Sequence, residues 1–237
     1  FLKNEFLVIT ETGELLEGGR GFGYWCHQRN LPLEKTIEEF ISTKAKYANY
    51  YTVEGFINGT PKLLNTAGFK SIYLNELFYL DFYAIERFGK TRLGTILHYA
   101  KQGQNKFLMR MMMDEVGPRI KKLIDEIGAD AIGFAPPTIK RETQIMDFIR
   151  NALTINVAQI DIQKMSGIIP VPQKSLNKLH ERITNANNTF AVFGNQTFKK
   201  VLLIDDAVGS GATLNQIAKK IKEKGVAKQV VGLAIVG

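Results

Sequence analysis

The stretch Val201–Leu214, with the sequence VLLIDDAVGSGATL, decides the fold and points to a binding site. Its first four residues are apolar, as in a short buried strand, and two carboxylates, Asp205 and Asp206, follow directly. A loop of small residues, Ala207–Thr213, comes next. Apolar residues then recur at the i, i+3, i+4, i+7 spacing of a helix, at Leu214, Ile217, Ala218 and Ile221. The order of strand, acidic pair, loop and helix predicts a site for a phosphorylated sugar.

The residue types of this stretch suit that ligand. Gly209 and Gly211 let the backbone turn tightly and approach a ligand closely, while the N–H groups and the dipole of a helix N-terminus favour a phosphate. Ionised carboxylates only accept hydrogen bonds, so Asp205 and Asp206 suit the hydroxyls of a ribose. An ordinary strand–loop–helix turn with an aspartate cap is the alternative interpretation. The residues expected to bind the phosphate are Ala207, Val208, Gly209, Ser210, Gly211, Ala212 and Thr213.

Strands and helices alternate along the chain from about Thr91. We expect a helix over Lys106–Ile127, broken or restarted at Gly117-Pro118, because proline suits a first helical turn. The pattern further predicts strands at Ala131–Phe134 and Val230–Val236, a helix at Gln144–Leu153 and a strand within Ile155–Ile162. Such alternation predicts an α/β fold with a doubly wound parallel sheet, in which ligands bind beyond the carboxyl ends of the strands.

Residues 1–90 lack the alternating strand and helix pattern of residues 91–237. Their residue pattern predicts a β-rich or α+β appendage. Phe6–Ile9 and Leu15–Leu16 flank a turn and predict a hairpin, and Thr36–Tyr47 is a candidate helix. Tyr50–Phe56 and Ser71–Leu74 are aromatic and β-branched, and Leu77–Arg87 is ambiguous between helix and strand. Candidates to stack on a base, or to fill a core, are Tyr24, Trp25, Tyr50, Tyr51, Tyr79, Phe82 and Tyr83.

Composition limits the classes of protein. The chain has 237 residues, of which 45% are hydrophobic, and no apolar run of about 18 residues that would predict a membrane span. FLKNEFLVIT lacks the apolar core of a signal peptide, so we expect a cytoplasmic protein. The single cysteine, Cys26, excludes a disulfide framework or a four-thiolate zinc site within this chain. The net charge of +8 suits polyanionic partners.

The Val201–Leu214 stretch resembles the phosphoribosyl pyrophosphate (PRPP) signature of type I phosphoribosyltransferases. That family also carries a pyrophosphate loop after its first core strand, and FAPPTIKR at 134–141 is in the matching place. The guanidinium group of an arginine can donate two parallel hydrogen bonds to a pyrophosphate, and a lysine adds a positive charge. The resemblance therefore implies pyrophosphate-binding residues at Pro137, Thr138, Lys140 and Arg141.

Residues 93–237 are similar in particular to the ComF-type competence and phosphoribosyltransferase subgroup. The similarity rests on His98–Gly103, on Arg141 with Gln144, and on the run Pro172-Gln173-Lys174, Arg182, Asn185 and Phe190. Two features differ. ComF-type proteins usually begin with a cysteine zinc ribbon, which one cysteine cannot form, and their Gly-Phe-Asn is replaced by Glu142-Thr143.

The resemblance implies an enzyme that binds PRPP with Mg²⁺, transfers phosphoribosyl to a small-molecule acceptor and releases pyrophosphate. Asp205 and Asp206 would be its catalytic acids. Mg²⁺ would be held mainly through PRPP. Asp205 and Asp206 are the candidates for a direct protein ligand. Lys174 and Arg182 are lid candidates, and residues 1–90 would supply any hood over the acceptor. Enzymes of this family are often dimers, so the resemblance allows a homodimer, while the sequence itself leaves the oligomeric state open.

Two other functions remain open from the sequence. One is a non-catalytic ComF-like module that binds PRPP or a nucleotide and handles single-stranded nucleic acid, which the basic charge favours. The other is a nucleotide-binding α/β protein whose ligand only resembles PRPP. The twin acids disfavour it, because a plain phosphate site does not need them. The sequence does not identify the acceptor.

Overall fold

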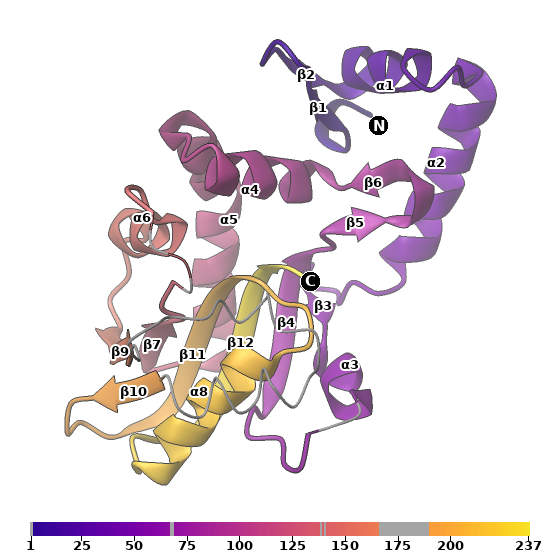
Figure 1. The fold of residues 1–237 in the computed structure, drawn as a ribbon. Helices are drawn as coiled ribbons and strands as arrows, with labels where there is room; N and C mark the ends of the chain where they lie inside the picture. Colours follow the sequence, from indigo (N-terminus) through magenta and orange to yellow (C-terminus); the bar gives the residue numbers. More distant parts are fainter. Residues whose placement is uncertain (1, 67–68, 138, 140, 166–189) are drawn as a thin grey trace.

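The computed structural model describes residues 2–66, 69–137, 139, 141–165 and 190–237 (Figure 1). Four residues of the expected site lie outside these ranges. They are Thr138, Lys140, Lys174 and Arg182.

Within the described residues, one six-stranded sheet forms the centre of the fold, in the order β3-β4-β12-β11-β7-β8. The pairs from β4 to β8 are parallel, and β3 pairs antiparallel with β4. This mostly parallel sheet confirms the predicted α/β class. The strands are β3 (Ile57–Asn58), β4 (Glu76–Asp81), β12 (Ala227–Val236), β11 (Phe198–Ala207), β7 (Ala131–Phe134) and β8 (Ala158–Gln159).

Apolar side chains cover both faces of this sheet, as a doubly wound fold requires. Successive strand residues point to opposite faces. Leu202 and Ile204 therefore pack against α4 (Arg92–Gln102), α5 (Lys106–Ile127) and α6 (Ile145–Ala152). Val201 and Leu203 pack on the other face, against α3 (Thr60–Asn65) and α8 (Ala212–Glu223), and Figure 1 shows α8 in front of β11 and β12.

The predicted break at Gly117-Pro118 is wrong, because α5 is one continuous helix of 22 residues. Pro118 is exposed, whereas Val116 and Ile120 are fully buried. The backbone bond that proline removes therefore lies on the solvent side, where water can satisfy the carbonyl group. Burial of the apolar stripe of α5 holds the helix together across this position.

The segment expected to hold one strand after α6 holds two. Ala158–Gln159 forms β8 in the central sheet, and Asp161–Lys164 forms β9, which pairs antiparallel with β10 (Phe190–Phe193). Ile162 and Val192 point inward and pack in the cluster that contains α8. This two-stranded sheet therefore extends the apolar layer on that face.

The first part of the chain confirms the predicted hairpin, formed by β1 (Leu7–Ile9) and β2 (Leu15–Glu17). Helices α1 (Gly18–His27) and α2 (Leu33–Ala48) follow. Aromatic rings from these segments and from η2 (Glu86–Phe88) form a separate core of Phe6, Phe22, Trp25, Phe40 and Phe88. Short elements complete this part: η1 (Leu2–Asn4), β5 (Ala84–Ile85), η2 (Glu86–Phe88) and β6 (Gly89–Lys90).

The central sheet extends across the expected boundary at residue 90. Strand β4 pairs in parallel with β12, and β3 pairs with β4. The ambiguous segment from Leu77 thus begins as a buried strand. The aromatic and β-branched stretches Tyr50–Phe56 and Ser71–Leu74, expected to contribute to a β-rich unit, form no strand. Tyr51 forms only an isolated β-bridge with Ile57. The division into two domains stays a prediction.

None of the helices in the described ranges is both long and apolar enough to cross a membrane.

Candidate functional site

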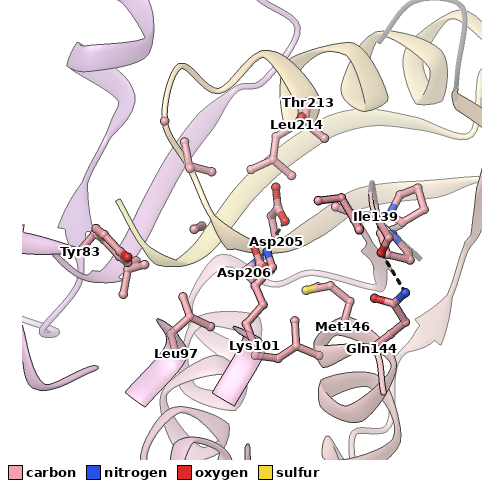
Figure 2. Close-up of a pocket in the computed structure, with 18 of the residues that line it drawn as sticks. Tyr83, Leu97, Lys101, Ile139, Gln144, Met146, Asp205, Asp206, Thr213 and Leu214 are labelled. Atoms are coloured by element: carbon pink, nitrogen blue, oxygen red, sulfur yellow. Dashed lines mark hydrogen bonds and ion pairs between the residues drawn. The ribbon is translucent and has the colours of Figure 1, made fainter. Parts of the chain in front are cut away.

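A pocket of about 500 Å³ opens at the carboxyl ends of β7, β11 and β12. Its lining comes from the β11–α8 connection, the segment after β7, α4, the start of α6, and Tyr83 (Figure 2). These segments meet because the parallel strands all end at the same edge of the sheet, where ligands of such folds bind. The expected sugar and phosphate residues, 205–213, all line it.

The two acids lie at the end of β11 and point in different directions. Strand alternation places Asp205 on the α8 side and Asp206 on the α4 side. Figure 2 shows Asp205 directed toward Leu214 and Asp206 directed toward Lys101. Asp206 is buried, at 4% exposure, and its Oδ2 forms an ion pair with Nζ of Lys101 on α4. The acids are therefore not equivalent, which the sequence did not predict.

A hydrogen bond links the acids to each other. The backbone N–H of Asp206 donates to Oδ1 of Asp205 at 2.8 Å. This bond limits the rotation of the Asp205 side chain, which otherwise faces the glycine-containing loop. The carboxylate of Asp205 thus lies in the pocket beside that loop.

The loop Ala207–Thr213 contains the turn that leads into α8. Gly211 has a φ of +79° and is the N-cap residue of α8. The first backbone bond into the helix runs from N–H of Asn215 to the carbonyl of Gly211, at 2.9 Å. The N–H groups of the preceding turn therefore come before the helical ladder, where they suit an anion. Val208 anchors the loop by donating its N–H to the carbonyl of Val236 at 3.0 Å.

The segment after β7 forms the opposite wall. Pro137 and Arg141 both line the pocket, as expected for the pyrophosphate side. Arg141 donates through Nη2 to Oε1 of Gln102 at 3.4 Å, and the N–H of Thr143 donates to Oε1 of Gln104 at 2.7 Å. The end of α4 and the residues after it therefore hold this wall.

Helix α4 contributes side chains that the sequence analysis did not assign to the site. His98, Lys101 and Gln102 line the pocket. Their i, i+3, i+4 spacing puts them on one face of the helix, and this spacing is the pattern by which sequence reasoning could have found them. Helix α4 thus forms a third, polar wall.

Tyr83 forms the side of the pocket near His98. Its hydroxyl lies 3.0 Å from Nδ1 of His98. Burial lowers the pKa of His98 below its ordinary value, and the ammonium of Lys90 lowers it further. Among the seven aromatic candidates, all of them described, Tyr83 is the one that lines this pocket. Trp25 belongs to the separate aromatic core.

Carboxylates are the groups through which the protein could contact a divalent cation here. In the described part of the chain, no group of three or more His, Cys, Asp or Glu residues could hold a metal ion. Asp205 and Asp206 both line the pocket, and carboxylate oxygens are the ligands that Mg²⁺ prefers.

These features define an α/β protein with a pocket that contains acidic and basic side chains at the carboxyl edge of a mostly parallel sheet. No protein-family model and no curated protein matches the chain. A solved structure of a hypoxanthine phosphoribosyltransferase from Staphylococcus aureus is similar at 11% identity, with a TM-score of 0.27. The similarity covers 51% of this chain and 62% of that chain. At this level it assigns neither a family nor an activity.

Proposed function

We propose that the protein binds PRPP with Mg²⁺ and transfers its phosphoribosyl group to a small-molecule acceptor, with release of pyrophosphate. The observation that carries the proposal is the arrangement of the pocket. An acid pair and a glycine-containing helix N-terminus form one wall, and the segment with Arg141 forms the wall opposite. The pocket therefore offers carboxylates that can accept hydrogen bonds from sugar hydroxyls. It also offers two places suited to phosphate groups, at the N-terminus of α8 and beside Arg141.

The described residues suggest a role for each wall. The loop Ala207–Thr213 would bind the 5-phosphate, and Asp205 would accept hydrogen bonds from the ribose hydroxyls. Arg141, with the expected Pro137, Thr138 and Lys140, would bind the pyrophosphate by charge-assisted hydrogen bonds. Mg²⁺, when bound, would neutralise pyrophosphate charge, and the nearby carboxylates fit it as oxygen ligands.

The reaction needs mainly positioning and charge stabilisation. The bond from the anomeric carbon to the pyrophosphate oxygen would break and pyrophosphate would leave with the bonding electrons. The acceptor would form a bond to that carbon and release its proton to solvent. Positive charge develops on the sugar ring, where carboxylates on the adjacent wall stabilise it. His98 and Tyr83 lie on the remaining side, where an acceptor would enter.

Calorimetry of PRPP with Mg²⁺ tests the proposal directly. Wild type should bind, and Asp205→Asn should lower the affinity by tenfold or more, roughly the effect of losing a charged hydrogen-bond partner. Asp125→Asn, on the exposed side of α5, is the matched control and should bind as wild type does. Pyrophosphate release would then be screened against purine, pyrimidine and amine acceptors. Failure of the wild type to bind PRPP would contradict the proposal.

A non-catalytic module that handles single-stranded nucleic acid is the second candidate, favoured by the net charge of +8. Binding of labelled single-stranded DNA and RNA, measured at several salt concentrations, distinguishes the two. A strong salt dependence without PRPP binding would support this second function. A homodimer and a cytoplasmic location stay predictions, and sedimentation of the purified protein tests the first.

A further inference from the structure

The pair formed by Lys101 and Asp206 joins two parts of the pocket. Lys101 lies on α4, 105 positions before Asp206 on β11. The side chain of Asp206 is 6% exposed and that of Lys101 is 24% exposed. A carboxylate this deeply buried is stable as an ion only when a counter-ion and hydrogen bonds compensate for its lost hydration. Lys101 supplies that compensation.

The same end of α4 is joined to the opposite wall. Gln102, next to Lys101, accepts from Arg141 at 3.4 Å, and Gln104 accepts from the backbone of Thr143 at 2.7 Å. Lys101 connects this end of α4 to the end of β11. Through this end of α4, the pair therefore connects the wall with the acids to the wall with Arg141.

We infer that the two acids have different tasks: Asp205 contacts the sugar, and Asp206 with Lys101 is a positioning pair that holds the sugar and pyrophosphate walls in register. This inference rests on the proposed function of the site. It predicts that loss of the pair lowers the affinity for ligands that contact both walls. A ligand that contacts only the loop and Asp205 should be affected much less.

The test compares two probes, PRPP with Mg²⁺ and ribose 5-phosphate alone, by calorimetry. Lys101→Met should lower PRPP affinity about tenfold or more, because small misplacements of binding groups have large effects. It should lower ribose 5-phosphate affinity less than about threefold. Lys101→Arg keeps the charge and should restore PRPP binding to within about threefold of wild type. Asp205→Asn should lower the affinity for both probes.

A double-mutant cycle keeps the test informative where one variant folds poorly. If Lys101 and Asp206 act as a unit, Lys101→Met/Asp206→Asn should bind PRPP no more weakly than the worse single variant. This double variant also leaves no unpaired buried charge. Lys44→Met is the control, because the Lys44 side chain is about as exposed as that of Lys101, pairs with Glu5 at 2.6 Å and does not line this pocket. Its affinity for both probes should equal that of wild type.

The outcomes separate the inference from the proposed function. A wild type that binds neither probe overturns the proposed function. A wild type that binds both probes, with Lys101→Met either unchanged or weakened equally for both, overturns the inference alone. Additive losses in the double-mutant cycle would also overturn it, because Asp206 would then contact the ligand independently of Lys101.

Discussion

Asn215 on α8 holds Tyr73 in place across 142 positions of sequence. Its Oδ1 accepts the backbone N–H of Tyr73 at 2.7 Å and that of Leu74 at 3.3 Å, and its Nδ2 donates to the carbonyl of Ser71 at 3.1 Å. Asn215 is fully buried. The segment that leads into β4 is therefore fixed to the helix whose N-terminus forms the candidate phosphate loop.

Asn215→Ala should lower the free energy of unfolding by about 2–4 kcal/mol, because the partly buried backbone groups of Ser71 and Tyr73 and the buried N–H of Leu74 lose their partner. Urea unfolding measures the effect. Asn195→Ala is the control, since Asn195 is exposed, and it should change stability by less than about 0.5 kcal/mol. A loss below about 1 kcal/mol for Asn215→Ala would show that other contacts hold this segment.

Gly211 and Gly209 should respond differently to alanine. Gly211 has a φ of +79°, and a Cβ there would lie 2.8 Å from Cδ1 of Leu63. A Cβ on Gly209 would meet nothing within 4 Å. Gly211→Ala should therefore destabilise the protein by about 1–2 kcal/mol, from the left-handed backbone and the contact together, and Gly209→Ala should not. Thermal unfolding of both variants checks this, and equal effects would contradict it.

His98 should titrate below its ordinary pKa, and Lys90→Met should raise that pKa, because a nearby positive charge disfavours the imidazolium. The Hε1 resonance of His98 in NMR reports both. Lys62, whose ammonium lies over the ring of Tyr79, provides the control variant Lys62→Met. An unchanged titration in Lys90→Met would contradict the assigned cause.

The same shift gives a direction for stability. The unfolded chain binds the His98 proton more readily than the folded protein does. The contribution of His98 to stability is therefore present above pH 6.5 and is lost as the pH falls through the lower, folded pKa. Lys90→Met should reduce this loss, which unfolding measured over that pH range would reveal.

Pro118→Ala should stabilise the protein by about 1–3 kcal/mol, because alanine restores an N–H inside an intact helix and proline is the least favourable residue there. Pro118 is exposed, so the change removes no buried contact. Urea unfolding again measures the difference. A destabilised variant would show that the proline ring makes stabilising contacts in α5, or that it lowers the conformational entropy of the unfolded chain enough to outweigh the lost hydrogen bond.

Local patterns carried most of the correct predictions. Strand β11, the glycine turn and helix α8 were all evident in Val201–Leu214, because strand hydrophobicity, a glycine at positive φ and helical spacing depend on neighbouring residues. The hairpin of β1 and β2 and strand β7 were predicted for the same reason. The break at Pro118 was wrong because burial on the inner face of α5 outweighs one missing bond.

The sequence by itself determined the α/β class and the glycine-containing loop after β11, since both follow from short-range periodicity and residue type. Only the tertiary structure decided that β4 joins the sheet beside β12 and that, of the two acids that line the pocket, Asp206 pairs with Lys101 on α4. These arrangements depend on which distant surfaces fit together when apolar side chains leave water. Local spacing does not specify such long-range packing.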